Sequence, residues 1–183
     1  MTTATPAGEE LYASKVAYRY AALGFAPVAT PTDVILVQGS ATKTIRIKRV
    51  KLGGVATAAG NMPAQLIKRT SAPTLGSAVL TAITAAKHDS GDPAPSAVVS
   101  TVGTANITTP GTAAGNFGAG RVQLSAAGSG VAANDQVWEF VTRMDKAPVL
   151  RGASEYLAIN FNGAALPGGA VFDYEIETEE DNS

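Results

Sequence analysis

Apolar and polar residues alternate near the end of the chain in the pattern of β-strands. In residues 156–162 and 170–178 every second side chain is apolar, so one face of each segment is predicted to be buried. The predicted core side chains of these two strands are Leu157, Ile159, Phe161, Phe172, Tyr174 and Ile176. Turn residues at positions 162–163 and 167–169 lie between the strands, which predicts a hairpin with a longer loop.

Two segments in the first part of the chain predict strands of different kinds. In residues 15–20, Val16, Tyr18 and Tyr20 alternate with charged or small residues, as in a strand with one buried face. Residues 33–38 form a nearly continuous apolar run. Such a run is typical of a strand that is covered on both faces.

The strand that follows contains a change of phase. Ile45 and Ile47 lie on one face, and Val50 and Leu52 continue the alternation one position out of step. A β-bulge inserts one extra residue into a strand and shifts the alternation in this way. We therefore predict a bulge near residues 48–49.

Weaker apolar runs fill much of the remaining chain, at residues 62–68, 97–102, 106–109, 121–125 and 136–142. Residues 73–87 fit either a strand or a short helix, and their threonine and isoleucine content favours a strand. Residues 110–120, with the sequence PGTAAGNFGAG, are predicted to form a loop because of their glycine content.

This pattern predicts an all-β fold with eight to ten short strands and no long helix, specifically an antiparallel β-sandwich of jelly-roll type. The 183 residues suit one domain, and 19 Gly and 10 Pro interrupt the chain too often for long helices. We expect an N-terminal arm at residues 1–14, a β-sandwich domain at residues 15–178 and an acidic tail at residues 179–183. The first ten residues lack the pattern of a signal peptide, and no run of about 18 apolar residues predicts a membrane span.

The chain has no cysteine and one histidine, His88. Asp89 and Ser90 follow it directly, but adjacent residues on a turn rarely converge on one reacting centre. His88, Asp89 and Asp92 have the donor atoms for a divalent cation. The same residues, followed by Pro93, are also typical of a tight turn, which is the interpretation we favour.

Two further carboxylates lie in or beside predicted strands, Glu139 and Glu155. A glycoside hydrolase needs a pair of carboxylates across the scissile bond, but only their acidity supports these two. We predict that the chain is not an enzyme and that it has no catalytic residue, no cofactor and no metal site. A hydrolase that uses His88 or this carboxylate pair ranks third among the functions considered.

Charged residues are unevenly distributed, although the formal net charge is only −1. No acidic residue occurs between Val34 and His88, whereas six acidic residues lie within residues 173–181. The candidate residues for contact between chains are Leu11 and Tyr12 in the arm and Lys43, Arg46, Lys48, Arg49 and Lys51 in the basic strand. Complementary charges set the register of an assembly. Plain solvated sheet faces remain an alternative, and nucleic-acid binding is weaker because no aromatic residues are interleaved with the basic ones.

Four segments resemble one family when read in order. They are SATKTIRIKRVKLGGVATA (residues 40–58), LIKRTSA (66–72), HDSGDPAPSAVV (88–99) and LRGASEYLAINFNGAALPGGAVFDYEIETEE (150–180). Together they resemble the small jelly-roll proteins that decorate or cement the heads of tailed bacteriophages. The resemblance implies a virion structural protein, often a homotrimer, on the outer capsid surface. Its partners would be other copies of itself and the major capsid protein, with no nucleic acid and no membrane.

A ligand-binding module is the alternative function, for example a carbohydrate-binding β-sandwich of a tail fibre or a bacterial surface protein. Carbohydrate sites commonly present exposed aromatic side chains. Trp138 and most Tyr and Phe residues fall at alternating strand positions that suit a core. Tyr12 and Phe117 lie in the predicted arm and loop, and they are the aromatic residues that keep this alternative open.

Overall fold

The computed structural model describes residues 15–126, 128, 134–140 and 146–181. These residues form twelve strands and no helix, which confirms the all-β class with more strands than the eight to ten predicted. The strands are β1 (Lys15–Phe25), β2 (Asp33–Gln38), β3 (Thr44–Ala56), β4 (Gly60–Arg69), β5 (Val79–Ala82), β6 (Ala86–Lys87), β7 (Val98–Gly103), β8 (Ala113–Ala126), β9 (Gln136–Glu139), β10 (Val149–Arg151), β11 (Tyr156–Asn160) and β12 (Val171–Asp181).

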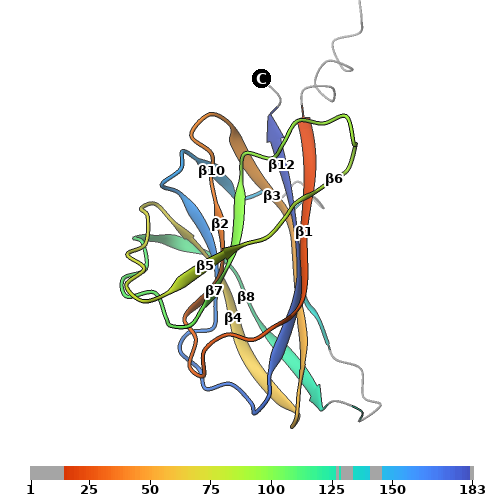
Figure 1. Ribbon diagram of the computed structural model, residues 1–183, viewed down its shortest axis with the longest axis vertical. Coiled ribbons are helices and arrows are strands. Elements are labelled where there is room, and N and C mark those ends of the chain that lie inside the picture. The colour runs from red at the N-terminus through yellow and green to blue at the C-terminus, as the bar shows by residue number, and fades with distance from the viewer. Residues whose placement is uncertain (1–14, 127, 129–133, 141–145, 182–183) are drawn as a thin grey trace, which may run out of the picture.

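The strands join into one curled sheet, shown in Figure 1, in the order β5-β7-β2-β11-β4-β8-β3-β12-β1-β6. The short strands β9 and β10 both pair with β3. The pairings are antiparallel except for a short parallel contact between β3 and β8. The curl brings the strands around β12 opposite the strands around β11, and the main core fills the space between them.

The predicted core positions of β11 and β12 are confirmed, but the predicted hairpin between them is wrong. All six apolar side chains of this prediction are buried. However, β11 pairs with β2 and β4, whereas β12 pairs with β1 and β3. The loop between them crosses from one side of the core to the other, so Phe161 and Phe172 meet across the core with ring centroids 4.7 Å apart.

Two other predictions about strands are confirmed. Strand β2 is covered on both faces, because a second apolar cluster around Leu36 and Ile107 covers its outer side. The bulge in β3 lies at Lys48, since Glu177 of β12 is opposite Arg49 while the next residue, Thr178, is opposite Ile47. The bulge allows Ile47 and Val50 to point into the same core.

Strand β8 corrects the prediction of a loop at residues 110–120. From Ala113 onward the segment pairs antiparallel with β4. Two of its glycines, Gly118 and Gly120, provide space for other side chains, because a Cβ on Gly118 would collide with the indole of Trp138. A Cβ on Gly120 would likewise collide with the side chain of Gln136.

The segment 73–87 contains the short strands β5 and β6, as its composition favoured. The acidic end of the chain differs from the prediction of a tail that begins at residue 179. Strand β12 continues through Asp181, and Glu180 is fully buried. The predicted arm, with Leu11 and Tyr12, and the last two residues lie outside the described residues.

Candidate functional site

Charged side chains cover the outer face of β1, β12 and β3, which we call the ion-paired face. Alternation along each strand directs the apolar side chains inward and the charged ones outward. Acidic side chains from β12 form the middle row, and basic side chains from β1 and β3 lie on either side of it. The basic strand noted in the sequence therefore lies beside the acidic strand of the same chain.

Ion pairs connect these rows. They are Lys15 Nζ–Glu179 Oε1 (3.1 Å), Lys48 Nζ–Glu179 Oε2 (2.9 Å), Arg46 Nη1–Asp181 Oδ1 (2.6 Å), Arg19 Nη2–Glu177 Oε2 (3.1 Å), Arg19 Nε–Glu175 Oε1 (3.8 Å) and Arg49 Nη1–Glu175 Oε1 (3.3 Å). Burial raises the pKa of Glu179, but the ammonium groups of Lys48 and Lys15 outweigh it and hold that pKa below its ordinary value. Most of these side chains are half-buried, and each such pair stabilises a fold by about 0–1 kcal/mol.

The candidate contact residues are thus placed as follows. Arg46, Lys48 and Arg49 lie on the ion-paired face with partners in their own chain. Lys51 pairs with Asp135 next to β9. Lys43 precedes β3 and has no ion-pair partner among the described residues. Their contact with another chain stays a prediction.

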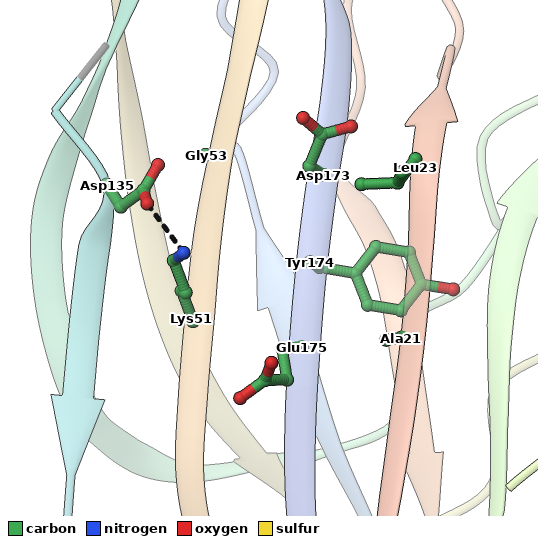
Figure 2. Close-up of a pocket in the computed structure, with 8 residues that line it drawn as sticks. All are labelled: Ala21, Leu23, Lys51, Gly53, Asp135, Asp173, Tyr174 and Glu175. Atoms are coloured by element: carbon green, nitrogen blue, oxygen red, sulfur yellow. Dashed lines mark ion pairs between the residues drawn. The ribbon is translucent and has the colours of Figure 1, made fainter. Parts of the chain in front are cut away.

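A shallow hollow of about 210 Å³ opens at one end of this face, between β1, β12 and β3 (Figure 2). We call it the Leu23 hollow. It is lined by Ala21, Leu23, Lys51, Gly53, Asp135, Asp173, Tyr174 and Glu175. Lys51 Nζ lies 2.8 Å from Asp135 Oδ2, and their hydrogen bond and opposite charges raise the pKa of Lys51. Asp173 Oδ1 accepts a hydrogen bond of 2.8 Å from the Gly24 N–H.

A buried polar cluster on the opposite side of the molecule was missed by the sequence analysis. Asp33 accepts two hydrogen bonds of 2.7 Å from the Arg69 guanidinium and one of 2.5 Å from the Asn160 amide. Arg69 also donates to the Gly111 carbonyl at 2.9 Å. A charged residue at the first position of an apolar run, as Asp33 is, was the one signal available in the sequence.

Glu180 forms a second buried polar cluster. Its carboxylate accepts hydrogen bonds from the Ser96 N–H and hydroxyl and from the Ala97 N–H, at 2.7–3.1 Å. Beside it, the Tyr18 and Tyr20 hydroxyls donate to the Pro93 and Ala97 carbonyls. Burial, together with the nearby Glu180, raises the pKa of Tyr20. These contacts fix residues 93–97 against β1 and β12.

The residues considered for catalysis and metal binding lie in three separate places: residues 88–92 in one turn, Glu139 at the end of β9 and Glu155 just before β11. His88 is exposed, and residues 88–93 form the predicted turn, in which the Asp89 side chain accepts a hydrogen bond from the Gly91 N–H. Among the described residues, no three His, Cys, Asp or Glu side chains are grouped so that they could hold a metal ion.

The two candidate carboxylates have separate surroundings. Glu155 pairs with Lys68 at 3.0 Å. Glu139 of β9 is opposite Arg49 of β3 in the sheet. Burial raises the pKa of Glu155, but the Arg151 N–H and the Lys68 ammonium outweigh burial and lower it. A general acid of a hydrolase needs a raised pKa at neutral pH, so the pKa of Glu155 is shifted in the opposite direction.

Comparisons with protein families, with curated proteins and with solved structures find no match to this chain. The part of the chain that the structure describes contains no helix long and apolar enough to cross a bilayer.

Proposed function

We propose that the chain is a structural protein of a tailed-phage virion, which decorates the outer surface of the head and stabilises it by bridging major capsid protein subunits. The proposal includes a homotrimer and assigns no catalytic step. It is carried by one observation: the four segments that resemble head decoration proteins form a single connected unit of the fold. Residues 40–58 contain β3 and residues 150–180 contain most of β12, and these strands pair along their length.

The two shorter segments belong to the same unit. Residues 66–72 include the end of β4, which pairs with β11. Residues 88–99 are held on β1 and β12 by Tyr18, Tyr20 and Glu180. A resemblance that falls on contacting parts of one scaffold supports a shared fold better than scattered similarity would.

The proposal also includes the β-sandwich of jelly-roll type. Consecutive strands repeatedly cross between the two sides of the core, as in the steps from β1 to β2, from β3 to β4 and from β11 to β12. Jelly rolls have crossings of this kind, because their neighbouring strands are rarely consecutive in sequence. Their two sides also face each other around one core, as the main apolar cluster does here.

The ion-paired face suits a protein that must keep its shape on a particle. Six contacts link three neighbouring strands, so this face is held together by side chains as well as by the backbone ladder. Networks of several charges hold a surface better than isolated pairs do. A rigid surface loses less conformational entropy when it binds a partner, which favours association.

The test is mass spectrometry and cryo-electron microscopy of purified virions that carry this chain. We expect the protein in the particle and density for it at a repeating position on the outer capsid surface. Light scattering of the isolated protein should give the mass of a trimer. Absence from the particle would refute the proposal, and a stable monomer would favour a tethered module instead.

The carbohydrate-binding alternative is retained because of Phe117. Its side chain is 43% exposed on β8, whereas Trp138 is 8% exposed and belongs to the core. One exposed aromatic ring is a small platform for a sugar. A glycan array that shows specific binding, abolished by Phe117→Ala, would place this function ahead of capsid decoration.

A further inference from the structure

The ion-paired face changes character along its length. Near Lys15 and Asp181, cations and anions alternate and pair. Towards the other end of the same strands small and apolar residues replace most of the outward charged ones, and Asp173 is the charged residue that remains among them. The small and apolar residues are Ala21, Leu23, Gly53, Val55 and Val171, with Val137 on the neighbouring β9.

The Leu23 hollow is built by small residues and bordered by a large one. Gly53 has no side chain, and a Cβ there would collide with the Asp135 carboxylate, which lies over β3. Leu23 is 86% exposed, the most exposed large apolar residue in the described part of the chain. In Figure 2 its side chain extends from β1 towards Asp173. A single exposed leucine is ordinary, but here it forms the apolar wall of a depression.

The charges around the hollow do not balance. Asp135, Asp173 and Glu175 line it together with a single cation, Lys51. Lys51 pairs with Asp135, and Glu175 pairs with the arginines of the ion-paired face. Asp173 pairs with no cation among the described residues, and its one hydrogen bond comes from the neutral Gly24 N–H. The carboxylate that remains unneutralised is therefore the one beside Leu23.

We propose that the Leu23 hollow binds a lysine or arginine side chain presented by a partner protein. The methylene stem of such a side chain would lie along Leu23, and its charged head would reach the Asp173 carboxylate. Long basic side chains bind in this manner, with the stem on apolar surface and the head at a charge. This inference goes beyond the proposed function, because it assigns a ligand, one basic side chain, to a hollow on which that proposal does not depend.

Charge complementarity also decides between a basic partner and a second copy docked by the same face. A two-fold contact through this face would place two hollows with excess negative charge against each other. Like charges brought together at an interface disfavour that contact. A basic side chain would be attracted to the hollow, whereas a second identical hollow would be repelled by it.

The experiment is NMR titration of the isotope-labelled protein with N-acetyl-arginine amide, with N-acetyl-norleucine amide as the uncharged probe. We expect saturable shifts of the Leu23, Gly53 and Asp173 amides in the millimolar range with the arginine probe alone. Asp173→Asn should weaken binding about tenfold, equivalent to about 1.4 kcal/mol. The variant keeps an oxygen that can accept the Gly24 N–H bond, so the end of β1 should hold its conformation.

Two further variants make the test specific. Glu139→Gln removes an exposed carboxylate of β9 outside the hollow and should leave the titration unchanged. Leu23→Ser should weaken binding without unfolding the protein, since Leu23 is 86% exposed. Equal effects of Asp173→Asn and Glu139→Gln, or no localised shifts, would overturn the inference. A change of molecular mass caused by Leu23→Ser would overturn it in favour of a second copy.

Discussion

Arginine–carboxylate pairs occur on both outer faces of the curled sheet, but water reaches only one of the two pairs. On β3 and β12, Arg46 and Asp181 are 27% and 31% exposed. On β4 and β2, Arg69 and Asp33 are 9% and 0% exposed, because the segment between β4 and β8 covers them. An arginine and an aspartate thus form an ion pair in both places, but only the Arg69–Asp33 pair has its charges removed from water.

The difference determines what each pair does for the fold. An exposed pair gains little, because water and salt screen the attraction. Removing both charges of a buried pair from water costs free energy, so the net contribution of the pair to stability can be near zero. Removing one partner is nevertheless costly, because it leaves the other charge buried and unpaired. The buried pair also ties three strands together, through Asn160 of β11, and holds the covering segment through the Gly111 carbonyl.

The largest effect that separates the two faces is expected from Arg69→Ala. The substitution leaves the Asp33 carboxylate buried without its cation, which should reduce the free energy of unfolding by about 3–5 kcal/mol. Urea unfolding followed by circular dichroism measures this. Arg46→Ala is the matched control on the exposed face.

The double variant Asp33→Leu/Arg69→Met sharpens the same comparison. It removes both charges together, so it should be more stable than Arg69→Ala. If Arg69→Ala costs no more than Arg46→Ala, the Asp33–Arg69 pair is not buried and the contrast between the two faces disappears.

The sequence predicted which face of a strand is buried better than it predicted which strands pair with each other. Period-two alternation reports which side chains are buried, and it identified the core of β11 and β12 and the bulge at Lys48. Pairing depends on contacts between distant segments, so the turn residues between β11 and β12 suggested a hairpin where the chain crosses the core instead. The partner of Asp33, 36 positions away, was hidden for the same reason.

Composition misled the prediction in two places. Glu180 was assigned to an acidic tail because charged residues usually lie in water, yet four hydrogen bonds satisfy its carboxylate in the interior. The glycines of β8 suggested a loop, although Gly118 and Gly120 make room for side chains of β9. The Leu23 hollow had no signal in the sequence, because it depends on three strands at once.

The second largest effect is expected from Gly118→Ala. The added methyl group would collide with the Trp138 indole, so the indole or β8 must shift, at a cost of about 1–3 kcal/mol. Gly103→Ala is the matched control, because Gly103 also lies in a strand but its nearest neighbour is 4.0 Å from an added Cβ. Thermal unfolding of both variants measures the difference. Equal stability of the two would mean that Trp138 does not pack on β8.

A smaller effect is expected from pH at the centre of the ion-paired face. The pKa of Glu179 is lowered in the folded chain below 4.5, so its ion pairs stabilise the fold above that pH. The stabilisation is lost as the pH falls through the folded pKa. Glu179→Gln should therefore make unfolding less dependent on pH between about 5 and 3. Glu139→Gln is the control, and an identical pH profile for both variants would contradict the prediction.

The smallest effect is expected from Arg46→Ala, and it tests the exposed side of the comparison directly. Arg46 Nη1 lies 2.6 Å from Asp181 Oδ1, a short contact that suggests a strong pair if distance alone is considered. Because both side chains remain partly in water, we expect a loss of only about 0.2–1 kcal/mol at low salt. The loss should shrink in 1 M salt, where the Debye length is about 3 Å. Arg121→Ala, which removes an exposed arginine without an ion-pair partner among the described residues, provides the baseline for losing an arginine side chain. A loss above about 2 kcal/mol that salt does not change would mean that Arg46 is as dependent on its partner as Arg69 is, and that exposure does not distinguish the two faces.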